Sequence, residues 1–141
     1  MNRTMCLSLA LAGTLVALPL HAASPQDLIA DYATEAARTQ QGFVASAERG
    51  KAFFLRNWNV ADKMPNCAAC HTERPAAQGT HVITAKSIRP LAPSANPDRF
   101  ADAAKAEKWF RRNCTEVVGR ECSAAEKADL VRFLVVAGGA S

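Results

Sequence analysis

The chain has 141 residues, of which 49% are hydrophobic and 21% are charged, and its formal net charge is +4 at pH 7. This length is enough for one domain with a single core. So small a positive charge does not indicate nucleic-acid binding.

Residues 1–22 have the pattern of a secretory signal peptide. Arg3 precedes a long apolar run, which ends in small residues typical of a cleavage site. The run contains Gly13 and Pro19, which favours cleavage over a membrane anchor. We therefore expect residues 23–141 to form a soluble mature domain that is exported to the periplasm.

The first predicted helix begins at Ser24. The serine is a suitable N-cap and Pro25 fits the first helical position. Leu28, Ile29 and Tyr32 then fall on one face, which predicts that this face packs on the rest of the domain.

The second predicted helix covers residues 45–57. Gly50 and Phe54 lie on one side of it by i, i+4 spacing. A glycine inside a helix lowers its stability, so we expect another helix to approach closely at this position.

Residues 61–96 are rich in proline and glycine, and only Thr80–Thr84 is expected to be extended. So long an irregular stretch in a small domain indicates that something other than secondary structure organises it.

Two more helices are predicted after this stretch. The third is expected to begin at Asn96-Pro97-Asp98 and to run to about Asn113. Its inward positions are Phe100, Ala104 and either Trp109 or Phe110. A capping box at Ser123–Glu126 opens the last helix, which should end at about Ala137 before two glycines. Its apolar stripe comprises Leu130, Phe133, Leu134 and Ala137.

The stretch CAACH, residues 67–71, is the attachment pattern of c-type haem. The thiols of Cys67 and Cys70 can add to the two haem vinyl groups, and His71 is then placed as the proximal iron ligand. A thioredoxin-like redox pair would need a βαβ context, and a zinc site would need a second convincing ligand pair; neither is present. The motif therefore predicts one covalent haem c.

The helices before and after the motif resemble those of class I cytochromes c. In that family a glycine and an aromatic residue on the first of two crossing helices meet an aromatic residue on the last. Gly50, Phe54 and Phe133 match this pattern by position. The resemblance implies an all-α, class I cytochrome c fold, with helices packed round one covalent haem.

The sixth iron ligand is less evident. Met64 is the only methionine outside the signal peptide, and it lies too close to the motif to reach the opposite haem face. A His81 ligand would give a closed, low-spin haem, although a lone loop histidine is more often solvated. Asn113 is the other candidate for the ligand, with Trp109 at i−4 and Phe110 at i−3. Alternatively, Asn113 is only a helix-end residue that hydrogen-bonds the backbone.

A resemblance favours Asn113. The segment WFRRNCTEVVGREC, preceded by PLAPSANPDRF and followed by SAAEKADLVRFL, resembles the Sphaeroides haem protein (SHP) group of DUF1924-type, high-spin class I cytochromes c. The resemblance implies that His71 is the proximal ligand and Asn113 a weak distal ligand. It also implies a Cys114–Cys122 disulfide beside Asn113.

In the distal pocket, Trp109 or Phe110 would limit which ligands enter. Pro90 is the class I candidate for accepting the N–H of the proximal imidazole through its carbonyl. Lys86 or Arg89 could neutralise a haem propionate, although both are expected to be solvated loop charges.

These features predict an electron-transfer cytochrome whose distal ligand leaves on reduction, so that the ferrous haem binds O₂, NO or CO. The resemblance implies a dihaem cytochrome c and a membrane cytochrome b as redox partners. The alternatives are a haem enzyme that reduces O₂ or peroxide or oxidises NO, a bis-histidine electron carrier, and a gas carrier or sensor. A peroxidase would need a distal acid–base group, for which only His81 is available, so a non-enzymatic role is favoured.

Overall fold

A computed structural model of the protein describes residues 23–139, and the expected signal peptide lies outside this range. Within it, five helices are joined by loops and one short antiparallel hairpin: α1 Pro25–Ala37, α2 Ala47–Leu55, α3 Ala68–His71, β1 Gly79–Thr80, β2 Ser87–Ile88, α4 Ala103–Val118 and α5 Ala124–Ala137. The fold is all-α apart from this hairpin, as predicted. None of the described helices has both the length and the apolar character needed to span a bilayer.

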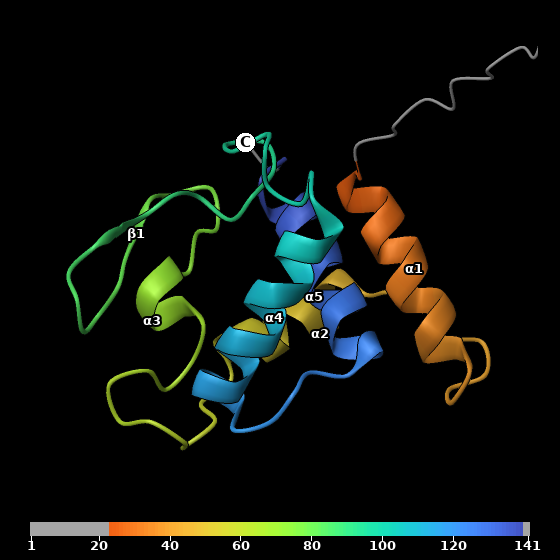
Figure 1. The fold of residues 1–141 in the computed structure, drawn as a ribbon, viewed down its shortest axis with the longest axis horizontal. Helices are drawn as coiled ribbons and strands as arrows, with labels where there is room; N and C mark the ends of the chain where they lie inside the picture. The colour runs from red at the N-terminus through yellow and green to blue at the C-terminus, as the bar shows by residue number, and fades with distance from the viewer. Residues whose placement is uncertain (1–22, 140–141) are drawn as a thin grey trace, which may run out of the picture.

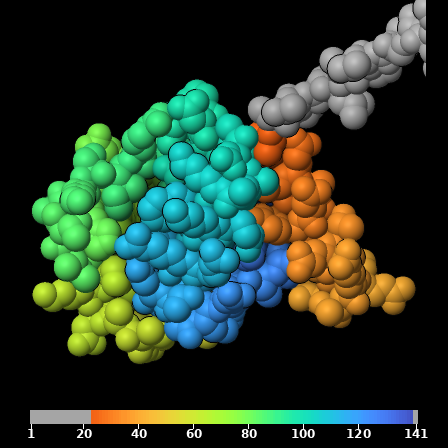
Figure 2. All heavy atoms as spheres, in the orientation of Figure 1, coloured from red at the N-terminus to blue at the C-terminus, as the bar shows by residue number. Residues whose placement is uncertain are grey.

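The four longer helices lie together, and α3 and the hairpin lie to one side of them (Figure 1). In the space-filling view the green segment that contains the hairpin and the teal-to-blue helix α4 share one face of the molecule (Figure 2). The haem motif is therefore carried by the irregular half of the domain.

The crossing of α2 and α5 holds the core together. A Cβ atom added at Gly50 would lie 2.0 Å from the backbone oxygen of Asp129, so only glycine permits this approach. The rings of Phe54 and Phe133 lie next to it, with centroids 5.5 Å apart, and Phe54 is fully buried. The close approach predicted at Gly50 is confirmed.

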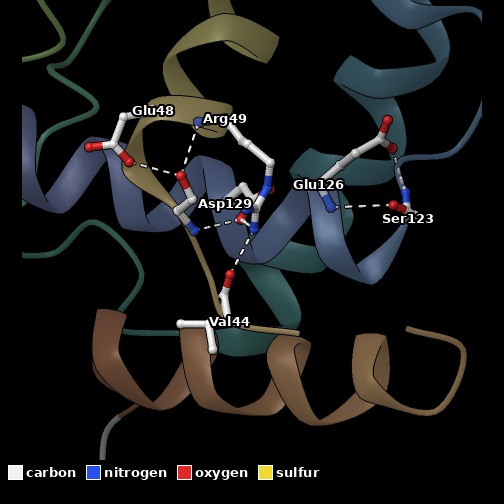
Figure 3. Close-up of polar contacts among 7 residues, drawn as sticks. Val44, Glu48, Arg49, Ser123, Glu126 and Asp129 are labelled. Atoms are coloured by element: carbon white, nitrogen blue, oxygen red, sulfur yellow. Dashed lines mark hydrogen bonds and ion pairs between the residues drawn. The ribbon is translucent and has the colours of Figure 1, made fainter. Parts of the chain in front are cut away.

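A buried carboxylate fixes the start of α2 on α5 (Figure 3). Asp129 is 6% exposed, and its carboxylate accepts hydrogen bonds from the Ser46 backbone N–H at 2.7 Å and from Arg49 Nε at 2.7 Å. Arg49 also donates to the Val44 carbonyl through Nη2, at 2.7 Å. One side chain of α5 therefore holds the segment that leads into α2.

The third predicted helix begins later than expected. Asp102 is its N-cap, with a side chain that accepts from the Lys105 N–H at 2.9 Å, and Asn96–Phe100 is a loop. Phe100 has φ +70°, which no helical residue adopts. The expectation of a start at Asn96 was therefore wrong, and Ala104 is exposed instead of inward.

The same helix also ends later than expected. It runs through Asn113 and stops at Val118, where Gly119 takes the left-handed conformation with φ +78°. Burial of Cys114 and Val118 in the core extends the helix past Asn113. Asn113 is thus a residue within the helix and not at its end.

The extended piece expected at Thr80–Thr84 is confined to its first residue. β1 ends at Thr80, and His81 to Ala85 form the turn of the hairpin, in which the Ala85 N–H donates to the His81 carbonyl at 2.9 Å. Ala85 has φ +55°, which a continuous strand would not allow.

Candidate haem site

Cys70 and His71 lie on one short helical turn, α3, and Cys67 is the N-cap of this turn. Asn66 fixes this turn from both sides: its Oδ1 accepts from the Ala69 N–H at 2.9 Å, and its Nδ2 donates to the Leu55 carbonyl at 3.3 Å. The motif is therefore tied to the end of α2. Both cysteines are half-buried, and neither forms a disulfide among the described residues.

The surroundings of the motif suit iron binding by His71. Burial raises the pKa of the Cys67 thiol to about 11, which keeps this thiol protonated at neutral pH. Burial, followed by the charges of Arg99 and His81, lowers the pKa of His71 to about 4, so its imidazole is neutral at pH 7. The neutral imidazole is the form that binds a metal. In addition, His71 Nδ1 is buried and has no hydrogen-bond partner in the part of the chain that the structure describes.

The hairpin packs directly on the motif. A Cβ atom added at Gly79 would lie 2.3 Å from the Cys70 carbonyl oxygen and 3.1 Å from His71 Cα. His81 follows in the turn, where its Nδ1 accepts from the backbone N–H groups of Ile83 at 3.2 Å and Thr84 at 3.4 Å. His81 thus belongs to the structural unit that carries the proximal histidine.

Helix α4 presents Trp109 and Asn113 one turn apart. Trp109 is 42% exposed, although it is a large apolar side chain, and Asn113 is also exposed. Arg112 lies over the Trp109 ring at 5.6 Å. An exposed indole beside an exposed amide is what a haem edge or face would cover.

Phe110 does not share this face. It is 8% exposed and packs edge-on against Tyr32, with ring centroids 5.8 Å apart. The expectation that Phe110 lines the distal pocket is corrected accordingly, because the structure uses this side chain to hold α4 on α1.

A disulfide joins Cys114 to Cys122, with Cα atoms 5.7 Å apart. Both residues are buried in the core. The bond links the helix that carries Asn113 to the residue before Ser123, the N-cap of α5. The position of Asn113 is therefore fixed relative to α5.

The contact expected between Pro90 and His71 is not made in this structure. The Pro90 carbonyl instead accepts from Asn96 Nδ2 at 2.9 Å and from Arg99 Nη2 at 3.2 Å. The sequence did not point to Asn96 or Arg99, because neither belongs to a recognisable spacing pattern.

Comparisons with known proteins agree with this site. A family model described as a domain of unknown function, DUF1924, matches residues 40–134. The chain belongs to this family. It is 44% identical over 135 residues to the cytochrome c-type protein SHP of Cereibacter sphaeroides, covering 95% of this chain and 98% of SHP. It is 41% identical over 87 residues to cytochrome c'' of Methylophilus methylotrophus, covering 61% of this chain and 60% of the relative.

Solved structures match as well. The structure of oxidized SHP, described as an oxygen-binding cytochrome c, has a TM-score of 0.74 at 45% identity, covering 81% of this chain and 97% of SHP. The structure of oxidized cytochrome c'' has a TM-score of 0.73 at 35% identity, covering 79% of this chain and 92% of cytochrome c''. The protein is therefore an SHP-like, monohaem class I cytochrome c with one covalent haem c. Two features fit a covalent haem: the half-buried side chains of Cys67 and Cys70, and the His71 imidazole, whose Nδ1 has no hydrogen-bond partner among residues 23–139.

Proposed function

We propose that the protein is an exported electron-transfer cytochrome in which Asn113 is a weak distal ligand. The amide binds in the oxidised protein and leaves on reduction, so that the ferrous form takes up O₂, NO or CO. The observation that carries the proposal is the exposed pair Trp109 and Asn113, on a helix fixed by the Cys114–Cys122 disulfide.

When bound, the haem would supply an iron that accepts and returns one electron and that could bind a diatomic gas. His71 supplies the proximal imidazole, which the low pKa keeps neutral. A neutral amide is a much weaker ligand than an imidazole or a thioether, which suits release on reduction. The exposed Asn113 amide could then donate a hydrogen bond to a gas ligand, and the exposed Trp109 ring beside it would limit access.

Two relatives support this proposal. SHP is described as an oxygen-binding cytochrome c, and a solution structure of cytochrome c'' is described in terms of haem-ligand detachment. That second structure matches this chain with a TM-score of 0.66 at 35% identity. A ligand that detaches is the property we propose for Asn113.

The alternative ligand, His81, is less well supported. It lies in the hairpin that packs on α3, and its ring nitrogen is engaged by the turn backbone. A bis-histidine carrier would need that turn to reach the opposite haem face. A peroxidase-like enzyme would need a distal acid–base group on α4, and no histidine lies on that helix.

Export and redox partners are part of the same proposal. Cleavage of residues 1–22 would release a periplasmic domain that receives electrons from a dihaem cytochrome c and a membrane cytochrome b. N-terminal sequencing of protein from a periplasmic fraction tests the first part. A mature chain starting near Ala23 is expected, and retention of Met1 would contradict export with cleavage.

The ligand proposal is tested by absorption spectra of the purified holoprotein, ferric and then dithionite-reduced, with and without CO. A high-spin ferrous spectrum that shifts on addition of CO is expected. A low-spin ferrous spectrum that ignores CO would overturn the proposal in favour of a strong sixth ligand such as His81.

A further inference from the structure

A group of buried polar atoms lacks partners beside the haem motif. His71 Nδ1, Asn96 Oδ1 and Arg99 Nε are all buried without a hydrogen bond among the described residues. Asn96 is only 3% exposed. A buried polar group without a partner is costly. Asn96 Oδ1 is an acceptor, which a carboxylate cannot complete, so the Nε–H donor of Arg99 is the atom that calls for an anion.

Backbone contacts bring the loop that carries Asn96 and Arg99 to the motif. The N–H groups of Leu91 and Ala92 donate to the Pro75 carbonyl at 2.9 and 3.0 Å, and Pro75 is four residues after His71. Asn96 Nδ2 and Arg99 Nη2 both bind the Pro90 carbonyl, which fixes their side chains to the same loop.

The charge of Arg99 has no counterion in residues 23–139. Its Nη2 bonds only backbone carbonyls, of Arg89 at 3.3 Å and Pro90 at 3.2 Å, and it takes part in no ion pair there. Burial, followed by the charge of another cation, Arg89, lowers the pKa of Arg99. A half-buried guanidinium in this setting calls for an anion.

Arg89 provides the contrast. Its side chain is 67% exposed and pairs with Asp98 at 3.4 Å, a residue that is itself 81% exposed. A solvated arginine with its own carboxylate contributes little to an anion site.

We propose that Arg99, positioned by Asn96 and the Pro90 carbonyl, binds a propionate carboxylate of the haem. The guanidinium Nε–H, which has no partner among residues 23–139, donates to a carboxylate oxygen, and the positive charge of Arg99 offsets the propionate charge. Arg89 remains a solvated surface residue. The inference depends on the haem and not on ligation by Asn113.

The test compares Arg99→Gln, Arg99→Lys and the matched control Arg89→Gln as holoproteins. Two quantities are measured: the midpoint potential, by spectroelectrochemical titration at fixed ionic strength, and the propionate-bending band in the resonance Raman spectrum. Loss of the Arg99 charge should favour the ferric form about tenfold, which lowers the potential by about 59 mV for a one-electron couple. The propionate band should shift as well.

Arg99→Lys keeps the charge and loses the Nε–H donor. It should shift the propionate band while holding the potential nearer to that of the wild type. Arg89→Gln should leave both quantities unchanged. Because the band reports hydrogen bonding to the propionate itself, a purely structural role for Arg99 would not move it.

Other outcomes overturn the proposal. If the propionate band is unchanged in Arg99→Gln, Arg99 binds no propionate. If Arg99→Gln fails to acquire haem, an unchanged band in Arg99→Lys leads to the same conclusion. Shifts in Arg89→Gln but not in Arg99→Gln would assign the carboxylate to Arg89. Spectra with and without CO separate this result from a failure of Asn113 ligation.

Discussion

The Cα of Gly50 lies against the backbone carbonyl of Asp129, so closely that a Cβ atom at position 50 would stand 2.0 Å from the carbonyl oxygen and 2.8 Å from the Cβ of Phe133. Backbone atoms cannot move aside as a flexible side chain can. Helices α2 and α5 therefore have a fixed separation at this point, and the Phe54 and Phe133 rings fill the space beside it.

Gly50→Ala should destabilise the holoprotein by about 3 kcal/mol, because the added methyl group forces the two helices apart. For a domain of this size, that corresponds to a fall in Tm of about 10 °C. Gly139→Ala is the matched control, since its nearest neighbour would be 3.7 Å from the new Cβ. Thermal unfolding of both variants checks the expectation, and equal Tm values would contradict it.

Local signals in the sequence predicted much of this fold. The N-cap at Ser24 and the capping box at Ser123 form as expected, because each depends on residues three positions apart. The haem motif could be predicted for the same reason, since Cys67, Cys70 and His71 are adjacent in the chain.

The start of α4 could not be predicted locally. Asn96-Pro97-Asp98 has the composition of a helix start, but Asn96 is used to hold the Pro90 carbonyl, six residues back. Phe100 then adopts a positive φ, which delays the helix to Asp102. A contact within the loop decides this conformation, and no periodicity in the sequence reveals it.

The end of α4 shows the same limit. Asn113 looked like a helix terminus, yet Cys114 and Val118 extend the helix because both are buried in the core. Arg99 was missed because it lies in a loop, 28 positions after His71, with nothing in the sequence to mark its burial.

A second prediction concerns pH. Glu107 accepts hydrogen bonds from Tyr32 OH at 2.8 Å and from Lys127 Nζ. These two bonds join α4, which carries Glu107, to α1 and α5. Burial acts to raise the pKa of Glu107, but the bonds from Lys127 and Tyr32 outweigh it and hold this pKa below its usual value of 4.5. The ionised carboxylate therefore stabilises the folded state above about pH 4.5, and this contribution is lost as the pH falls through the folded pKa.

Glu107→Gln should accordingly lower the Tm at pH 7, by an amount that shrinks below pH 4. The loss at neutral pH should be under about 1 kcal/mol, because the carboxylate is partly solvated. Glu73→Gln, at an exposed position, is the control. If the Tm difference between the wild type and Glu107→Gln is the same at pH 7 and pH 3.5, the Glu107 charge does not contribute to stability.

A third prediction concerns the disulfide. Replacing both Cys114 and Cys122 with alanine should lower the free energy of unfolding by about 2–3 kcal/mol, since the bond closes a short loop in the unfolded chain. Haem should remain attached through Cys67 and Cys70, which mass spectrometry of the intact chain measures. The denatured wild-type holoprotein should have no titratable thiol among these four cysteines. Two titratable thiols would contradict the disulfide.

The last prediction concerns the distal ligand. Asn113→Ala should abolish the six-coordinate ferric form. The haem should stay attached, because its thioethers are made by Cys67 and Cys70, which lie in the motif segment and not on α4. Loss of a ligand that favours the ferric form should raise the midpoint potential, by about 59 mV for each tenfold change in ligand preference. Asn113→His should instead give a low-spin ferrous haem that binds CO poorly, since imidazole is the stronger ligand.

His81→Ala is the control for this pair of variants. Its ferric spectrum should match that of the wild type, because His81 is engaged in the hairpin turn through its Nδ1. The decisive comparison is the ferric absorption spectrum of Asn113→Ala against that of His81→Ala. If Asn113→Ala keeps the six-coordinate ferric form and His81→Ala loses it, the distal ligand is His81. The hairpin must then reach the distal face of the haem.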